Sequence, residues 1–218
     1  MKKDFWLERW EQEEIGFHQD TINPYLSQFW PELHSSPDSL VFVPLCGKSQ
    51  DMLWLRKQNQ RVLGVELSPI AVQAFFKDNG YTAKHDTHDK FDHCTADGIS
   101  ILCGDFFDLN KDDLGGVSVV YDRASLVALP PEMREQYVHH LVSILPPGTQ
   151  ILLITFDYPQ SEMQGPPFSV SVSEVETLFC DHAEVRLLVQ LDVLSKNNRF
   201  QERGLSELRE NIFLLTLC

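Results

Sequence analysis

Residues 40–69 read LVFVPLCGKSQDMLWLRKQNQRVLGVELSP, and this stretch decides the fold. It holds two short apolar runs, 40–45 and 61–67, with a helical pattern over 51–58 between them. Continuous apolar runs of this length are typical of parallel strands that are buried on both faces. A Ser-Pro pair at 68–69 then supplies an N-cap and a first helical residue, so a second helix is expected to follow. Strand–helix alternation of this kind predicts a parallel sheet.

The alternation continues along the chain. Further strands are expected at 99–103, 117–121 and 150–156. A helix opened by Pro130 and Pro131 precedes the last of these strands. With the two strands described above, the pattern gives five strands of a doubly wound sheet, in which helices cover both faces.

The end of the chain departs from this alternation. Ser at 173 and Glu at 176 form a capping-box pattern, which predicts a helix start there. Two apolar runs follow, 185–194 and 211–217, and no helical pattern joins them, so they are expected to pair antiparallel. We therefore predict an α/β fold: a doubly wound, seven-stranded and mostly parallel sheet with an antiparallel C-terminal strand pair. Residues 82–98 are polar and are expected to be irregular.

The first 35 residues have a different character, because aromatic side chains are set among acidic ones. Phe5, Trp6 and Trp10 are spaced as on one side of a helix. Neither a linker nor a repeat interrupts the sequence, so residues 1–218 are expected to form one domain in which residues 1–35 act as a helical lid.

Composition excludes several classes of protein. The 32 Asp and Glu against 18 Lys and Arg give a net charge of −14, which argues against binding to nucleic acid or to an anionic membrane. No apolar run reaches the roughly 18 residues of a membrane span, and no apolar segment follows the two initial lysines as in a signal peptide. The five cysteines contain no Cys-x-x-Cys pair and are expected to be reduced, as in a cytoplasmic protein. The sequence has no exposed apolar stripe and favours a monomer.

Ligands of such sheets bind beyond the carboxyl ends of the strands. Gly-Lys-Ser at 47–49 resembles the end of a phosphate loop, but that motif needs a glycine at position 42, which is Phe. The G-x-G-x-x-G pattern of dinucleotide-binding proteins is also absent, because Gly47 is the only glycine in this loop. Glu66 nevertheless ends the second strand 19 residues after Gly47, where an acid binds the ribose of adenosine. Adenosine without pyrophosphate describes S-adenosylmethionine, whose cationic sulfonium suits acidic surroundings. The alternative is that Glu66 caps the next helix.

Two further strand ends carry candidate residues. Asp105 could accept a hydrogen bond from the adenine amino group while Phe106 packs on the ring, unless they are a turn acid and a core side chain. After the fourth strand, Arg123 would present a donor to the ligand, unless it forms a buried structural ion pair with Asp122.

Other patterns indicate less. The His, Asp and Cys residues between 85 and 94 match no metal-ligand spacing, and we predict a solvated loop and no metal site. No tyrosine is followed four residues later by lysine, which argues against a short-chain NAD-dependent reductase. Cys46 is interpreted as a small apolar filler rather than a nucleophile.

Over its whole length, from about Trp6 to Leu217, the chain resembles the thiopurine S-methyltransferase family. The likeness is carried by FVPLCGK at 42–48, VLGVELS at 62–68, DRA at 122–124, GPPF at 165–168 and LLT at 214–216. The Pro-Leu-Cys-Gly-Lys loop is unusual among methyltransferases and is therefore the most specific of these segments.

The resemblance implies a class I methyltransferase that moves a methyl group from S-adenosylmethionine to the sulfur of an aromatic or heterocyclic thiol and releases S-adenosylhomocysteine. Selenium or tellurium compounds are alternative acceptors, and a non-catalytic adenosine-binding protein is the alternative from another class. No covalent enzyme intermediate is expected. The resemblance places cofactor contacts at Trp10, Leu45, Gly47, Glu66, Asp105, Phe106 and Arg123. It places acceptor contacts at Phe17, Arg123, Pro166 and Arg199, with Arg123 orienting the acceptor thiolate.

Overall fold

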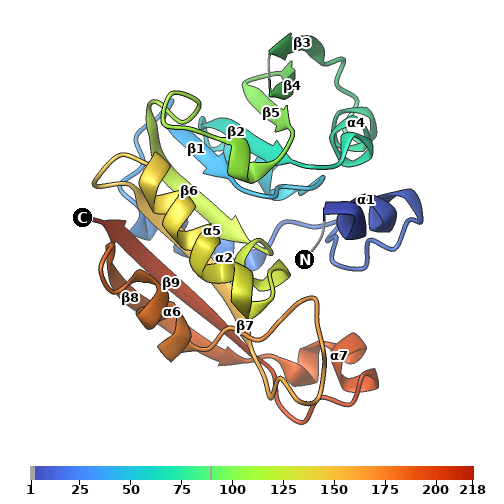
Figure 1. Ribbon diagram of the computed structural model, residues 1–218, viewed down its shortest axis with the longest axis vertical. Coiled ribbons are helices and arrows are strands. Elements are labelled where there is room, and N and C mark those ends of the chain that lie inside the picture. The colour runs from blue at the N-terminus through green and yellow to red at the C-terminus, as the bar shows by residue number, and fades with distance from the viewer. Residues whose placement is uncertain (1–2, 89) are drawn as a thin grey trace. The chain divides into compact units, whose positions relative to one another are not determined.

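In the computed structural model the apolar runs form parallel strands, as predicted. Strand β1 (Leu40–Val43) pairs in parallel with both β2 (Arg61–Glu66) and β6 (Val117–Arg123), and β2 pairs in parallel with β5 (Ile99–Cys103) (Figure 1). Their side chains are mostly buried, as the continuous apolar runs require. β1 ends earlier than predicted because the chain turns at Leu45, whose φ is +45°.

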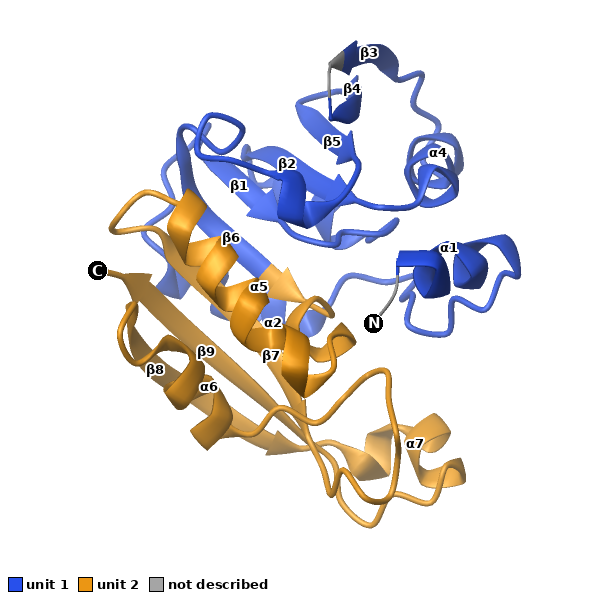
Figure 2. Ribbon diagram, in the orientation of Figure 1, with its two compact units in different colours: residues 1–121 blue, residues 122–218 orange. Residues whose placement is uncertain are grey.

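The structure describes residues 3–88 and 90–218, which divide into two compact units, residues 1–121 and 122–218 (Figure 2). The boundary falls inside β6.

The described residues of the first unit include four α-helices. They are α1 (Lys3–Glu11), α2 (Pro24–Phe29), α3 (Asp51–Lys57) and α4 (Pro69–Asp78). The start of α4 confirms the Ser-Pro prediction, because the Ser68 hydroxyl accepts a hydrogen bond from the N–H of Ala71 at 3.3 Å. Four side chains on one side of α4 are buried: Ala71, Val72, Phe75 and Phe76. This helix packs on β2 and β5, so its start lies next to the end of β2, where Glu66 stands.

A hairpin occupies the stretch that we expected to be irregular. β3 (Lys84–His88) pairs antiparallel with β4 (Phe91–Ala96), and β4 pairs antiparallel with β5. The described residues therefore form nine strands, not seven. The hairpin escaped prediction because its stability rests on backbone pairing, while only Phe91 and Cys94 carry buried side chains in β4.

The second unit begins with helix α5 (Pro131–Ile144). Its three strands are β7 (Gln150–Asp157), β8 (Ala183–Asp192) and β9 (Arg209–Leu217), in the order β7-β9-β8 with both pairings antiparallel. The α/β class and the antiparallel C-terminal pair are thus confirmed. The connection between β8 and β9 is not free of helix, since it contains the five-residue α7 (Asn198–Glu202).

The N-cap of helix α6 (Val172–Phe179) lies two residues before the predicted one. Ser171 is the N-cap, and its hydroxyl accepts the N–H of Glu174 at 3.2 Å. Ser173 lies inside the helix, where its hydroxyl contacts that of Ser171 at 3.1 Å. Both serines match the local preference for an N-cap, and the earlier one caps the helix in the structure. None of the described helices is long and apolar enough to cross a membrane.

Candidate active site

The carboxylate of Glu66 ties the end of β2 to the loop that follows β1. Its two oxygens accept the N–H groups of Ser68, at 2.7 Å, and Gly47, at 2.8 Å. Burial raises the pKa of Glu66 above its ordinary value, and hydrogen bonding to the backbone N–H groups of Ser68, Gly47 and Leu67 opposes that shift. Each carboxylate oxygen can accept a second hydrogen bond, so capacity for two hydroxyl donors remains. The structure thus contains the helix-capping contact and also leaves Glu66 able to bind a ribose.

The loop after β1 has an unusual backbone. Leu45 and Gly47 both adopt positive φ, +45° and +53°, and the left-handed region costs a non-glycine residue on the order of 1–3 kcal/mol. The indole of Trp10 lies against Gly47, because a Cβ placed on that glycine would come within 3.3 Å of Trp10 Cζ2. Strain of this kind is concentrated at functional sites. Trp10, Leu45, Gly47 and Glu66 are therefore brought together in one place.

Aromatic side chains of the N-terminal segment cluster on Trp10. The Phe17 ring contacts the rings of Trp10 and Trp6 edge to face, with centroids 5.6 Å apart in each pair. Trp10 is buried and Phe17 is half-buried. Phe17 is thereby linked, through Trp10, to the loop that contains Gly47.

The end of β5 lies next to the end of β2, since the N–H of Gly104 donates to the backbone carbonyl of Glu66 at 2.9 Å. Asp105 Oδ1 accepts the N–H of Phe107 at 3.0 Å, and the other oxygen forms an ion pair with Lys3 of α1. This contact raises the pKa of Lys3. Phe106 is only 2% exposed, so its ring belongs to the core of the unit; its packing on an adenine stays a prediction.

These residues of the first unit fit the adenosine part of S-adenosylmethionine. Glu66 offers acceptors for hydroxyl groups, the Gly47 backbone allows close approach, and Trp10 supplies an apolar wall. The carboxylates of Glu66 and Asp105 suit a cationic sulfonium.

Arg123 is the last residue of β6, and its side chain is half-buried. Ala124 turns the chain immediately afterwards with φ +65°, a second strained position at a strand end. The neighbouring Asp122 is 1% exposed and accepts hydrogen bonds from the hydroxyl of Tyr137 at 2.7 Å and the N–H of Leu126 at 3.3 Å. Asp122 therefore fixes the backbone from which Arg123 projects.

Tyr137→Phe is expected to destabilise the protein more at neutral than at acid pH. Burial raises the pKa of Asp122, and the hydrogen bond from the Tyr137 hydroxyl is the strongest influence opposing that shift. A raised pKa contributes stability that is present below the unfolded value and lost as the pH rises through the folded value. Removing the hydroxyl raises the pKa further, so we expect a loss of about 2 kcal/mol near pH 7 and less near pH 4, measured by urea unfolding.

Tyr81→Phe is the control for this experiment, because the Tyr81 hydroxyl makes an exposed 3.5 Å contact with Asp97. It should change the free energy of unfolding little at either pH. An equal loss at both pH values for Tyr137→Phe would contradict the assigned role of Asp122.

The 165–168 loop of the second unit holds Pro166, which is half-buried. The ring of Phe168 lies against Gly165, and the backbone N–H of Phe168 donates to the carbonyl of Val127 at 2.7 Å. Arg199 belongs to α7, and its pKa is lowered by loss of hydration and, secondarily, by the charge of Arg203. A role for either residue in binding an acceptor stays a prediction.

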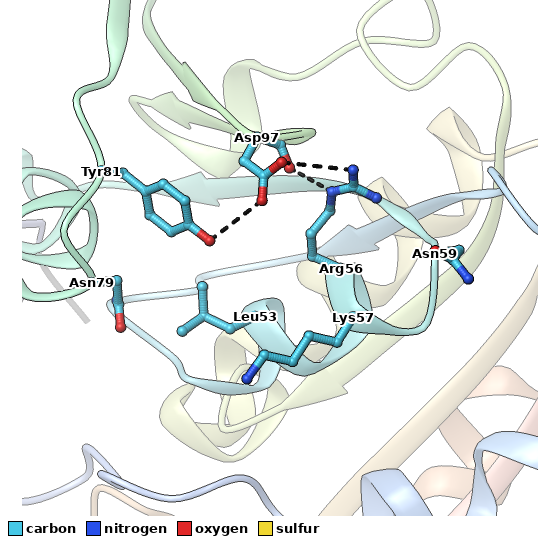
Figure 3. A pocket seen from close by; sticks show the side chains of 7 residues that line it. All are labelled: Leu53, Arg56, Lys57, Asn59, Asn79, Tyr81 and Asp97. Carbon is cyan, nitrogen blue, oxygen red and sulfur yellow. Dashed lines mark hydrogen bonds and ion pairs between the residues drawn. The ribbon is translucent and has the colours of Figure 1, made fainter.

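Two other features carry no site residues. Residues 85–88 and 91–94 lie in the β3–β4 hairpin, and Asp89 lies outside the described residues. In the described part of the chain no group of three His, Cys, Asp or Glu side chains is arranged to hold a metal ion. A pocket of about 440 Å³ in the first unit is polar (Figure 3). It is lined by Leu53, Arg56, Lys57, Asn59, Asn79, Tyr81 and Asp97. In this pocket the carboxylate of Asp97 forms an ion pair with Arg56 and accepts a hydrogen bond from the hydroxyl of Tyr81.

Comparison with known proteins decides the family. The sequence model of the family described as Thiopurine S-methyltransferase (TPMT) matches residues 1–217. The chain belongs to the thiopurine S-methyltransferase family. The thiopurine S-methyltransferase of Nitrosospira multiformis is 66% identical over 215 residues, which are 99% of this chain and 98% of the relative.

Solved structures agree with this family at the level of the fold. A SAM-dependent methyltransferase from Anabaena variabilis has a TM-score of 0.67 at 15% identity, covering 99% of this chain and 95% of its own. The 1,6-didemethyltoxoflavin-N1-methyltransferase of Burkholderia thailandensis, solved with S-adenosylhomocysteine, has a TM-score of 0.64 at 13% identity, covering 99% and 86%. The predicted family, the methyltransferase class and S-adenosylmethionine as cofactor are confirmed.

Sequence reasoning missed two charged residues. Lys3 pairs with Asp105 across about 100 residues of sequence, and nothing local signals such a contact. Arg134 is different, because it stands three, four and seven residues before the core side chains Tyr137, Val138 and Leu141. That spacing places Arg134 on the buried side of α5 and could have revealed it.

Proposed function

We propose that this protein transfers the methyl group of S-adenosylmethionine to the sulfur of aromatic or heterocyclic thiols such as thiopurines. The products are the S-methyl thioether and S-adenosylhomocysteine. The observation that carries the proposal is the match of residues 1–217 to a family whose 66% identical member is named for this reaction. The acidic, strained loop around Gly47 and Glu66 supports the cofactor half of it.

When bound, S-adenosylmethionine would supply an activated methyl group for in-line displacement by the acceptor sulfur, with S-adenosylhomocysteine as the leaving group. The chain therefore has to align the reactants and exclude water. Glu66 and Gly47 hold the adenosine part, while Trp10 and Asp105 border it. Burial raises the pKa of the Cys46 thiol well above its ordinary value, which supports a mechanism without an enzyme nucleophile.

The acceptor contacts are assigned to Phe17, Arg123, Pro166 and Arg199. A guanidinium near the acceptor sulfur favours its thiolate form, and each unit by which the thiol pKa is lowered is worth about 1.4 kcal/mol. Arg123 is given this role because it stands at the end of β6 beside the buried Asp122. Phe17 and Pro166 are assigned the apolar contacts, and Arg199 a second cationic contact.

Residues 1–218 are proposed to act as one methyltransferase domain, with residues 1–35 as its lid. Three contacts within the first unit support the lid: Lys3 with Asp105, Trp10 with Gly47, and the N–H of Asn23 with the buried carboxylate of Asp51 at 2.8 Å. We further propose a cytoplasmic monomer without nucleic-acid or membrane partners, and light scattering after size exclusion tests the monomer.

The proposed function is tested by titrating S-adenosylhomocysteine in a calorimeter and then measuring transfer of labelled methyl to 6-mercaptopurine. Binding with transfer supports the proposal. Binding without transfer would move the search to other acceptors, including selenium and tellurium compounds. Absence of binding would overturn the methyltransferase assignment itself.

Arg123→Ala is expected to lower kcat/KM for 6-mercaptopurine about 30-fold, because the acceptor loses the charge that favours its thiolate. Part of this loss should disappear at a pH above the thiol pKa, where the acceptor is already ionised. Arg61→Ala, an exposed arginine at the other end of β2 from Glu66, is the matched control and should leave transfer unchanged. Transfer by Arg123→Ala at the wild-type rate would remove Arg123 from the acceptor site.

A further inference from the structure

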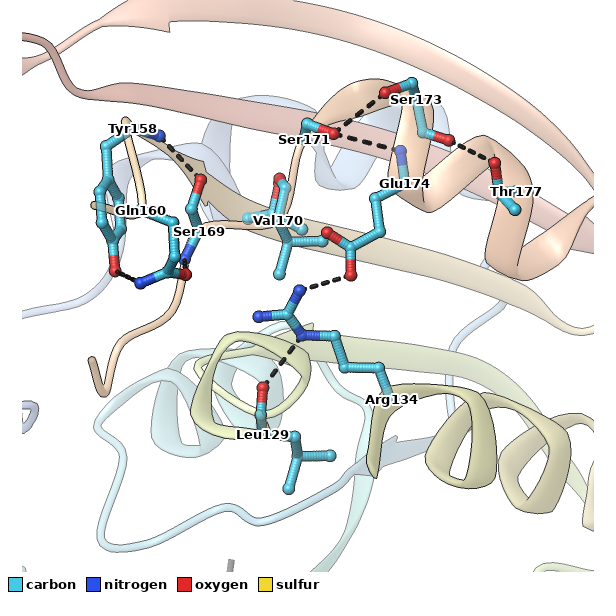
Figure 4. Close-up of polar contacts among 11 residues, drawn as sticks. Leu129, Arg134, Tyr158, Gln160, Ser169, Val170, Ser171, Ser173, Glu174 and Thr177 are labelled. Atoms are coloured by element: carbon cyan, nitrogen blue, oxygen red, sulfur yellow. Dashed lines mark hydrogen bonds and ion pairs between the residues drawn. The ribbon is translucent and has the colours of Figure 1, made fainter. Parts of the chain in front are cut away.

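Arg134 is a charged side chain in the core of the second unit. It lies in the first turns of α5 and is only 1% exposed, the largest of the side chains that are fully buried. Figure 4 shows its guanidinium between the turn that contains Leu129 and the start of α6. A buried charge is costly unless it is paired and hydrogen-bonded, so its partners indicate what it does.

Each part of the guanidinium has a different neighbour. Nε donates to the carbonyl of Leu129 at 3.0 Å, Nη1 forms an ion pair with Glu174, and the group lies over the ring of Phe168 with 5.9 Å to the centroid. Among the described residues Nη2 is buried without a hydrogen-bond partner. Arg134 therefore connects three segments: the turn at 126–129, the 165–168 loop and helix α6.

Two of these segments adjoin residues assigned to the acceptor site. The turn at 126–129 begins three residues after Arg123 and donates to Asp122 through Leu126. The same turn binds the 165–168 loop, because the carbonyl of Val127 accepts the N–H of Phe168 at 2.7 Å. Phe168 lies two residues after Pro166 in the sequence. Arg134 is bonded to the end of this turn and stacks on Phe168.

The loop is tied internally as well. The hydroxyl of Tyr158 donates to the carbonyl of Pro167 at 2.6 Å. The side-chain oxygen of Gln160 accepts the N–H of Ser169 at 3.0 Å (Figure 4). The loop is thus held by hydrogen bonds at both Pro167 and Phe168.

Stability alone does not account for such an arginine. Replacing a buried ion pair by apolar side chains of similar size is often neutral or stabilising, and Nη2 adds the cost of an unpaired donor. We propose that Arg134 is a positioning residue for methyl transfer, which fixes the 165–168 loop against the turn that follows Arg123 and so sets the shape of the acceptor pocket. The inference rests on the proposed function and deepens it.

The test compares four variants with the wild-type protein: Arg134→Met, Arg134→Lys, Glu174→Gln, and the double variant Arg134→Met with Glu174→Leu. Each is examined for kcat and KM with 6-mercaptopurine as acceptor, for the Kd of S-adenosylhomocysteine and for Tm. Arg209→Met is the matched control, because it removes an exposed ion pair to Glu207 in the same unit.

Arg134→Met is expected to raise KM for the thiopurine acceptor about tenfold, with kcat and the Kd of S-adenosylhomocysteine within about twofold of wild type. Arg134→Lys keeps a positive charge beside Glu174 but loses the planar guanidinium, which donates in several directions. Its Tm should therefore lie closer to that of the wild-type protein than the Tm of Arg134→Met does, while its KM should stay high. The double variant should recover Tm because no unpaired charge remains, and yet keep the high KM. Glu174 is partly exposed, so Glu174→Gln should fold and raise KM about threefold even if the arginine variants do not fold.

A double variant with wild-type Tm and wild-type KM would overturn the proposal, since Arg134 would then be only structural. Wild-type KM in Glu174→Gln and Arg134→Lys would do the same. Failure of the proposed function is recognised separately, because the wild-type protein itself would then transfer no methyl group to 6-mercaptopurine.

Discussion

Glu66→Ala is expected to weaken the binding of S-adenosylhomocysteine by about 100-fold or more, which corresponds to roughly 3 kcal/mol. The substitution removes the proposed acceptor for the ribose and leaves the N–H groups of Gly47 and Ser68 without their carboxylate. The loop after β1 thereby loses the contact that holds its strained backbone. Calorimetric titration measures the effect, and circular dichroism checks the fold.

Glu66→Gln separates charge from shape, because the amide has one acceptor oxygen for two backbone donors. Burial raises the pKa of Glu66, so the carboxylate becomes protonated at a higher pH than the ordinary value of 4.5. As the pH is lowered, the affinity of the wild-type protein for S-adenosylhomocysteine should therefore begin to fall while the pH is still above 4.5. The affinity of Glu66→Gln should not show this pH dependence. Glu135→Ala, an exposed acid of α5, is the control. Unchanged affinity in Glu66→Ala would mean that the protein does not use adenosine at this carboxylate.

The position of Glu66 at the end of a buried strand could be predicted from sequence because the signals are local. A buried strand ends at Glu66, Ser68 and Pro69 start the next helix, and both signals are physical preferences of a few neighbouring residues. The carboxyl ends of parallel strands meet at one edge of a sheet, so the sequence alone was enough to expect Gly47 and Glu66 together.

What could not be predicted depends on contacts between distant residues. The β3–β4 hairpin lacks a continuous apolar run, and α7 is too short for its sequence to stand out. The Arg134–Glu174 pair joins residues 40 positions apart and has no local motif, although the spacing on α5 puts Arg134 among core residues. The prediction of Ser173 as the N-cap was wrong because two serines compete for this position. The hydroxyl of Ser171 accepts the N–H of Glu174 and is the cap in the structure.

Gly64→Ala is the second substitution with a large expected effect, about 3 kcal/mol of lost stability, or a Tm lower by about 2–4 °C for each kcal/mol. Gly64 lies in β2, and a Cβ there would stand 2.6 Å from the sulfur of Cys46 and 3.4 Å from that of Met52. All three positions are buried, so the neighbours have little room to move. Gly115→Ala, where the nearest atom is 3.6 Å away, is the control and should be nearly neutral.

The double variant Gly64→Ala with Cys46→Ala should regain most of the lost stability, since the new methyl group then occupies the space of the removed sulfur. An additive loss in the double variant would show that the sulfur is not the obstacle. The same protein also tests the chemistry. Burial, and next the charge of Glu66, raise the pKa of Cys46 far above its ordinary value, which leaves it a neutral thiol and a poor nucleophile. We therefore expect the double variant to be both folded and active. A folded but inactive one would assign Cys46 to the reaction rather than to the packing between Gly64 and Met52.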